Sequence, residues 1–170
     1  MKPRYTKQRT KSDCGPVAIL NVIKWAGIRA TYGSSIEYIK SMARYRHTED
    51  FSGTHQWDLR RALNRMSRGR LKTRTIPVVH LDQLTKHINA DGAFILYHAM
   101  SDSDAHYTTV VKGEDGKFDW INMGPATVIS ITPEEFEKKV MSTQRLHDQV
   151  VALLIKKTPK LCSHTSRSRS

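Results

Sequence analysis

A cysteine at the start of a strongly apolar segment constrains this chain more than any other feature. The sequence Asp13-Cys14-Gly15-Pro16 is followed directly by the apolar stretch 17–25. Proline suits the first turn of a helix, and Ser12 or Asp13 can cap it. The stretch predicts a helix with apolar residues over most of its surface, which is typical of a helix buried in a core. Cys14 then lies at the helix N-terminus, where unpaired N–H groups and the macrodipole favour a thiolate.

The remaining periodicity predicts helices in the first half of the chain and strands in the second. The 170 residues suffice for one domain with a substantial core. Further helices are predicted over 35–44, 55–66 and 81–88, and another begins at Thr132. Extended segments are predicted over 75–79, 92–98, 106–112, 117–122, 126–131 and 149–156. Helices followed by an antiparallel sheet indicate the α+β class.

Both ends of the chain and one internal stretch are basic. The formal net charge is +12, and seven basic residues with no acidic one lie between Arg60 and Arg74. No nucleic-acid-binding motif accompanies them, so a solvated face is favoured over a nucleic-acid site, and an acidic partner remains open. The basic tail 158–170 is rich in Ser and Arg and is expected to be disordered, which leaves a domain over 1–157.

The sequence carries no signal of export, membrane insertion or metal binding. No apolar run approaches the roughly 20 residues that span a bilayer, and no signal peptide is present, which predicts a cytoplasmic protein without a membrane partner. Cys14 and Cys162 are too few for a disulfide framework and fit a reducing compartment. The histidines lack the close ligand spacing of zinc sites, so neither a metal nor an organic cofactor is expected.

Three polar residues supply what a cysteine nucleophile needs, namely a base, an orienting group and oxyanion donors. Gln8 lies six positions before Cys14, so its amide can join the Cys14 N–H in an oxyanion hole. His106 begins a strand after a polar loop over 100–105, and Asn122 ends the partner strand of the same hairpin. Strands of about six residues around a short turn bring positions 106 and 122 to one end of the ladder.

Alternatives exist for both partners of the cysteine. His98 is a rival base, although its place in an apolar strand favours a packed sheet residue. Asp119 is a rival orienting group, but it lies on the opposite strand face from Asn122. Asn122 is preferred because its position at the strand end matches that of His106.

For Asp13 and the three tryptophans, a structural role is favoured over a functional one. The negative charge of Asp13 would raise the pKa of an adjacent thiol, which argues against a direct activating role. The three tryptophans are expected in the core or between lobes, although one of them could border a substrate cleft. They are Trp25, Trp57 and Trp120, and Trp57 is the one near a cleft.

These residues together resemble the papain-like double-glycine leader peptidases, the processing domains of bacteriocin exporters and their stand-alone relatives. The resemblance is carried by Gln8, Asp13-Cys14-Gly15-Pro16, Gly53-Thr54 before a helix, His106-Tyr107 and a polar residue at 122. It implies a papain-like fold with an N-terminal helical lobe, a C-terminal antiparallel sheet and the active site between them. It also implies Cys14 as nucleophile, His106 as base and acid, Gln8 in the oxyanion hole and Asn122 as orienting group.

The chain departs from the family pattern in two places. Asn122-Met123-Gly124 stands where the family carries aspartate and proline, although other papain-like enzymes use asparagine. No transporter domain follows, so an enzyme acting alone or in trans is expected. The function predicted is a cysteine peptidase with a Cys-His-Asn triad that cleaves after small residues such as Gly-Gly.

Three other functions stay open at this point. An acyltransferase and a ubiquitin-like isopeptidase would use the same catalytic residues on a peptide or protein substrate. A non-enzymatic, basic nucleic-acid-binding protein on the same scaffold is the third, and it rests on charge alone.

Overall fold

The computed structural model describes residues 3–42, 46–47, 52–77, 81–101, 104–144 and 151–159. The first half contains helices α1 (Cys14–Trp25), α2 (Tyr32–Met42) and α3 (Gln56–Ser67), with a small antiparallel pair β1 (Arg46–His47) and β2 (Ser52–Gly53). The second half contains β3 (Leu71–Pro77), α4 (Leu81–Asn89), β4 (Ala93–Ser101), β5 (Asp104–Lys112), β6 (Phe118–Ile121), β7 (Val128–Ile131), α5 (Pro133–Gln144) and β8 (Val151–Lys157).

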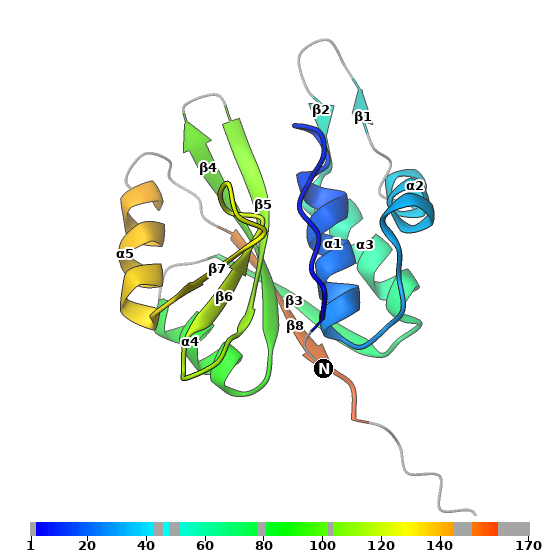
Figure 1. Ribbon diagram of the computed structural model, residues 1–170. Coiled ribbons are helices and arrows are strands. Elements are labelled where there is room, and N and C mark those ends of the chain that lie inside the picture. The colour runs from blue at the N-terminus through cyan, green and yellow to red at the C-terminus, as the bar shows by residue number, and fades with distance from the viewer. Residues whose placement is uncertain are drawn as a thin grey trace, which may run out of the picture.

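The six longer strands form one sheet in the order β3-β8-β4-β5-β6-β7, and every described pairing is antiparallel. Helices α1, α2 and α3 lie on one side of this sheet, and α4 and α5 lie on the other (Figure 1). The predicted α+β class, with a helical N-terminal lobe and an antiparallel C-terminal sheet, is confirmed.

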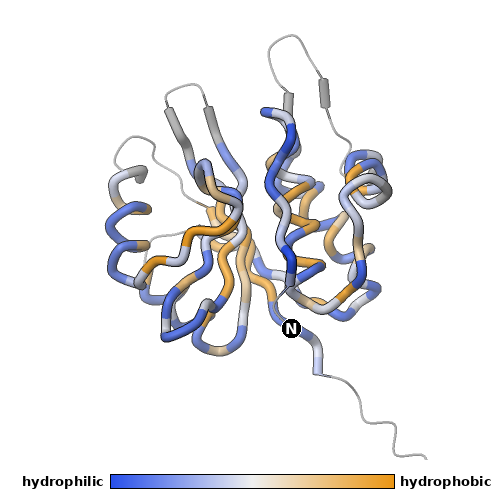
Figure 2. Tube along the Cα trace, in the orientation of Figure 1, coloured by the Kyte–Doolittle hydropathy of each residue, from blue (hydrophilic) through white to orange (hydrophobic). Residues whose placement is uncertain are grey.

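Alternate residues of the central strands face two separate cores, because successive side chains point to opposite faces of a sheet. Ile95 and Tyr107 pack against α1, α2 and α3, whereas Phe94 and Val110 pack in the core that includes α4 and α5. Figure 2 shows the apolar residues gathered along α1 and the central strands. Both faces of the sheet are therefore covered, and the central strand β4 begins with the continuous apolar run 93–97.

The buried character predicted for α1 is confirmed. Every residue of α1 from 14 to 23 is buried, and the apolar residues from Val17 to Ile23 are fully buried. The Thr109 hydroxyl on β5 donates to the Ala18 carbonyl at 3.0 Å, which joins α1 to the sheet. On its other flank, the Asn21 amide exchanges two hydrogen bonds with the Thr6 backbone, at 2.8 and 2.9 Å, and so holds the N-terminal segment along the helix.

Several sequence-based predictions of local structure need correction. Asp13 occupies the N-cap position, but its side chain makes no capping hydrogen bond and binds α2 instead. Helix α2 begins at Tyr32 rather than at 35. Strand β3 begins at Leu71 rather than at 75, because it pairs with β8 along its whole length. Strands β4 and β5 extend into the loop predicted over 100–105.

The environment of one tryptophan was also predicted wrongly. Trp57, expected to pack, is 62% exposed at the start of α3, whereas Trp120 is buried as expected. The expected tail lies outside the described residues from 160 onward. None of the helices in the described ranges is long and apolar enough to cross a membrane.

Candidate active site

Cys14 is the first residue of α1 and is 7% exposed. The N–H groups of a helix's first turn have no intrahelical acceptor, so they can stabilise negative charge at the sulfur. Gly15 allows another segment to approach this turn closely. A Cβ on Gly15 would lie 2.9 Å from both Cβ and Oγ1 of Thr54, the residue that follows β2. The Gly53-Thr54 segment is thereby held directly against the start of α1.

His106 and Asn122 lie in contact at one end of the β5–β6 hairpin, as the hairpin pattern predicted. The hairpin register pairs Thr109 with Ile121, and Asn122 leaves the ladder with a φ of +65°. The His106 Nε2 atom lies 2.7 Å from the main-chain carbonyl oxygen of Asn122. With the proton on Nε2, this contact is a hydrogen bond that leaves Nδ1 as the basic nitrogen of the ring.

The Asn122 side chain contacts Gln8 through both of its polar atoms. Asn122 Nδ2 donates to Gln8 Oε1 at 2.8 Å, and the Gln8 backbone N–H donates to Asn122 Oδ1 at 3.1 Å. Asn122 is the predicted orienting group, and in the structure its main-chain carbonyl faces His106, whereas its side-chain amide binds Gln8. Because Gln8 Oε1 accepts from Asn122, the NH₂ group is the donor end that remains for a substrate oxygen.

Two tyrosines on the neighbouring strands interact electrostatically with Cys14. Tyr97 on β4 is paired in register with Tyr107 on β5, next to the pair His98 and His106, and the tyrosine rings are 4.9 Å apart. Burial raises the pKa of Tyr107, and electrostatic interactions with Tyr97 and Cys14 raise it further. Burial and the interaction with Cys14 likewise raise the pKa of Tyr97. Cys14 is therefore within electrostatic range of both tyrosines.

The rival base, His98, is a buried member of the sheet. It is 2% exposed, and its ring lies 5.9 Å from that of His106 and 5.8 Å from that of Trp120. Burial, followed by the charge of His106, lowers the pKa of His98 to about 4. His98 is consequently neutral at pH 7.

The rival orienting group, Asp119, binds a residue of the neighbouring strand β7. It is fully buried, and its Oδ1 accepts a hydrogen bond from the Ser130 hydroxyl at 2.6 Å. Within the described ranges, no cluster of three or more His, Cys, Asp or Glu residues could hold a metal ion.

An apolar hollow lies beside the tyrosine pair, between α3 and the sheet. Its lining includes Gln56, Leu59, Ile95, Tyr97, Tyr107 and Leu153. Tyr97 and Tyr107 also interact electrostatically with Cys14. The hollow therefore borders residues within electrostatic range of Cys14.

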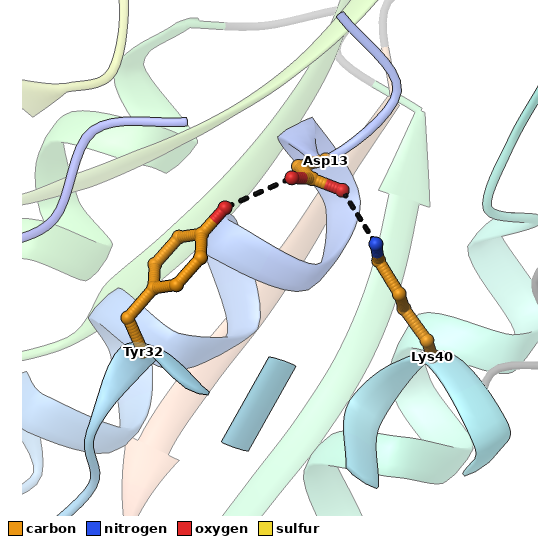
Figure 3. Close-up of polar contacts among 3 residues, drawn as sticks. All are labelled: Asp13, Tyr32 and Lys40. Atoms are coloured by element: carbon orange, nitrogen blue, oxygen red, sulfur yellow. Dashed lines mark hydrogen bonds and ion pairs between the residues drawn. The ribbon is translucent and has the colours of Figure 1, made fainter. Parts of the chain in front are cut away.

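A further polar cluster, formed by Asp13, Tyr32 and Lys40, lies next to the nucleophile. The sequence patterns did not predict it. The Tyr32 hydroxyl donates to Asp13 Oδ2 at 2.9 Å, and Lys40 Nζ lies 3.0 Å from Asp13 Oδ1 (Figure 3). Burial alone would raise the pKa of Asp13, but hydrogen bonds from Lys40, Tyr32 and Thr10, with the charge of Lys40, hold it below its ordinary value. No local sequence signal connects these residues, because Tyr32 and Lys40 belong to a different helix.

The fold is that of papain-like C39 peptidase domains. The peptidase domain of Streptococcus ComA, a bifunctional ABC transporter involved in a quorum sensing pathway, aligns with a TM-score of 0.59 and 17% identity, over 92% of this chain and 100% of that one. A double glycine motif protease from an AMS/PCAT transporter, solved with the leader peptide, aligns with a TM-score of 0.57 and 14% identity, over 92% and 93%.

A further structure of this fold has no transporter in its description. A Bacillus anthracis protein described as a C39-like peptidase aligns with a TM-score of 0.58 and 10% identity, over 92% of this chain and 96% of that one. No protein-family model and no curated protein matches the sequence. At these identities the likeness establishes the shared architecture of a helical lobe and an antiparallel sheet.

Proposed function

We propose that this protein is a cysteine peptidase with Cys14 as nucleophile, His106 as base and acid, and Gln8 as an oxyanion donor. One observation carries the proposal. Gln8, Asn122 and His106 form a single hydrogen-bonded cluster, although Gln8 and Asn122 are 114 positions apart in the sequence, and five residues of loop join Gln8 to Cys14. These are the side-chain types that covalent catalysis by a thiol requires.

The proposed reaction assigns one role to each group. His106 Nδ1 takes the proton from Cys14, and the thiolate attacks the peptide carbonyl. The Gln8 NH₂ group and the Cys14 N–H stabilise the resulting oxyanion. The Asn122 carbonyl accepts the His106 Nε2–H bond and stabilises the imidazolium, which then protonates the leaving amine. Water hydrolyses the acyl-enzyme and restores the thiol. Asn122 thus completes the predicted Cys-His-Asn triad through its main chain.

The substrate is proposed to be a peptide cleaved after small residues such as Gly-Gly. Support comes from the likeness to a double glycine motif protease that was solved with the leader peptide. A nucleophile of this kind requires a reduced cysteine, so the cytoplasm is the proposed location.

An acidic segment of the substrate is proposed to lie over α3. All seven basic side chains between Arg60 and Arg74 are exposed, and Asp58 is the one acidic residue from 56 to 74. The first turns of α3 lie close to the start of α1, because a Cβ on Gly15 would lie 3.2 Å from Leu59 Cδ2. A peptide that reaches Cys14 past α3 therefore lies over a positively charged helix face, which favours acidic residues there.

Cleavage of a peptide library, followed by mass spectrometry, tests the reaction and its specificity together. We expect cleavage by the wild type and by Cys162→Ser, and none by Cys14→Ala or His106→Ala. Full activity of Cys14→Ala would refute the mechanism. If an added amine acceptor is incorporated into the products, the protein is an acyltransferase. If cleavage is confined to ubiquitin-like conjugates, it is an isopeptidase. Salt-sensitive DNA binding without any cleavage would favour the non-enzymatic alternative.

Paired peptides that differ only in an acidic or neutral segment test the α3 surface. The double variant Arg61→Ala/Arg65→Ala is expected to reduce the preference for the acidic peptide, measured as the ratio of kcat/KM values, by about 2–10-fold, because exposed ion pairs are weak. Lys138→Ala/Lys139→Ala is the matched control, since it removes the same number of charges and both lysines are exposed on α5 across the sheet. An equal effect of both changes would indicate net charge rather than a binding surface.

A further inference from the structure

A buried carboxylate lies immediately before the nucleophile. Asp13 is 2% exposed, and a carboxylate in such a place requires partners that replace its hydration. Both partners shown in Figure 3 come from α2, with the Tyr32 hydroxyl at 2.9 Å from one oxygen and the Lys40 ammonium at 3.0 Å from the other. The Lys40 side chain is itself 27% exposed, so this ion pair is mostly shielded from solvent.

The charge of Asp13 opposes the chemistry proposed for Cys14. A negative charge beside a thiol disfavours the thiolate and raises its pKa. Lys40 supplies a compensating positive charge within contact distance of Asp13, so the pair acts on the sulfur as a dipole rather than as a net negative charge. The helix N-terminus can then stabilise the thiolate without an opposing charge from Asp13.

The same cluster restrains the loop between Gln8 and Cys14. The Arg9 guanidinium lies over the Tyr32 ring, 3.9 Å from its centre. The Asp13 N–H donates to the Thr10 carbonyl at 3.3 Å, which closes a turn within the loop. Helix α2 therefore contacts the loop both next to Gln8, through Arg9, and next to Cys14, through Asp13.

We propose that Lys40 is a positioning residue of the active site, which, by pairing with Asp13, keeps the Cys14 sulfur ionised and holds α2 against the loop that carries Gln8. This inference rests on the proposed function, because it concerns the same nucleophile. It adds a charge-compensating residue from outside the cluster of Gln8, His106 and Asn122.

The pH dependence of Cys14 alkylation by iodoacetamide tests the inference without a substrate. The parent protein carries Cys162→Ser and keeps Asp13 and Lys40. Its midpoint for Cys14 alkylation is expected at a pH well below the ordinary thiol pKa of about 8.5. Lys40→Met is expected to raise this midpoint by about 1 unit, which slows alkylation about tenfold at pH values below it. Lys40→Arg retains the charge and is expected to keep the midpoint.

A double variant separates charge compensation from a structural role. Asp13→Asn/Lys40→Met removes both charges, so its midpoint is expected to return to that of the parent. A midpoint that stays as high as in Lys40→Met, or a Lys40→Met variant that lowers only the melting temperature, would overturn the inference. If Lys40→Met does not fold, Asp13→Asn serves instead. It leaves the Lys40 charge uncompensated and should lower the midpoint, and an unchanged midpoint would again overturn the inference.

If the proposed peptidase function is wrong, the alkylation midpoints give a different result from the one expected if only the role of Lys40 is wrong. A parent protein whose Cys14 midpoint lies at or above about 8.5 has no activated thiol, whatever the Lys40 variants show. A low parent midpoint that is insensitive to every change at Lys40 and Asp13 supports the peptidase and refutes only the role of Lys40.

Discussion

Substitution of Asn122 by glycine separates the two roles that the structure gives to this residue. The change removes the amide and therefore both hydrogen bonds to Gln8, at 2.8 and 3.1 Å. It keeps the main-chain carbonyl that lies 2.7 Å from His106 Nε2. Glycine adopts the φ of +65° at this position without steric cost, so backbone strain does not contribute.

The expected loss of stability follows from the two hydrogen bonds. Each intramolecular hydrogen bond of this kind contributes about 1 kcal/mol, so Asn122→Gly should lower the free energy of unfolding by about 2 kcal/mol. Asn122→Ala should lower it by about 3 kcal/mol, because a side chain with a Cβ costs about 1 kcal/mol more in the left-handed region. For a chain of this length, 2 kcal/mol corresponds to a decrease in Tm of about 4–8 °C.

Two measurements check this reasoning. Urea unfolding gives the stability, and the pH profile of Cys14 alkylation gives the state of the thiol. We expect Asn122→Gly to keep the alkylation midpoint within a few tenths of a unit, because the carbonyl partner of His106 remains. His106→Ala should raise the midpoint by more than 1 unit. If Asn122→Gly raises the midpoint as much as His106→Ala does, the amide orients the imidazole and the assignment to the main-chain carbonyl is refuted.

Two further predictions concern packing and pH. Gly15→Ala should lower the free energy of unfolding by about 1–3 kcal/mol, because its Cβ would lie 2.9 Å from Thr54. Gly33→Ala has nothing within 4 Å of its Cβ and should raise the free energy of unfolding by up to about 1 kcal/mol. Equal changes of Tm in the two variants would contradict the close approach at Gly15. His98 has a pKa of about 4 in the folded protein, below the ordinary 6.5, so the unfolded chain binds its proton first as the pH falls. Stability should therefore decrease between about pH 6.5 and 4, by up to roughly 3 kcal/mol, and His98→Gln should flatten this decrease in pH-dependent urea unfolding. An unchanged acid slope would place the responsible proton elsewhere.

Local patterns predicted the elements that carry the candidate site. The apolar residues from Val17 onward cover most of the surface of α1, which predicts a buried helix with Cys14 at its start. The hairpin pattern likewise predicted that His106 and Asn122 meet, because a short turn fixes the pairing of the strands that it joins. Both predictions depend on residues that are close in the sequence.

Predictions failed where the partner lies on another element. Asp13 reads as a helix cap within its own segment, but the ammonium of Lys40 and the hydroxyl of Tyr32 compete for its carboxylate in the folded chain. Trp57 is predicted to pack because it is a large apolar residue. In α3, however, Leu59 is the residue that is buried, and Trp57 is exposed. Neither outcome can be read from a window of neighbouring residues.

The sequence by itself determined the buried helix that begins at Cys14, the hairpin that brings His106 to Asn122, and the order of a helical lobe before an antiparallel sheet. These follow from apolar periodicity and turn spacing, which act over a few residues. Only the tertiary structure decided that the Asn122 amide binds Gln8 while its carbonyl faces His106, and that Lys40 compensates Asp13. The physical reason is that a hydrogen bond or ion pair forms only over about 3 Å, and only the packing of separate elements against one another brings such residues within that range.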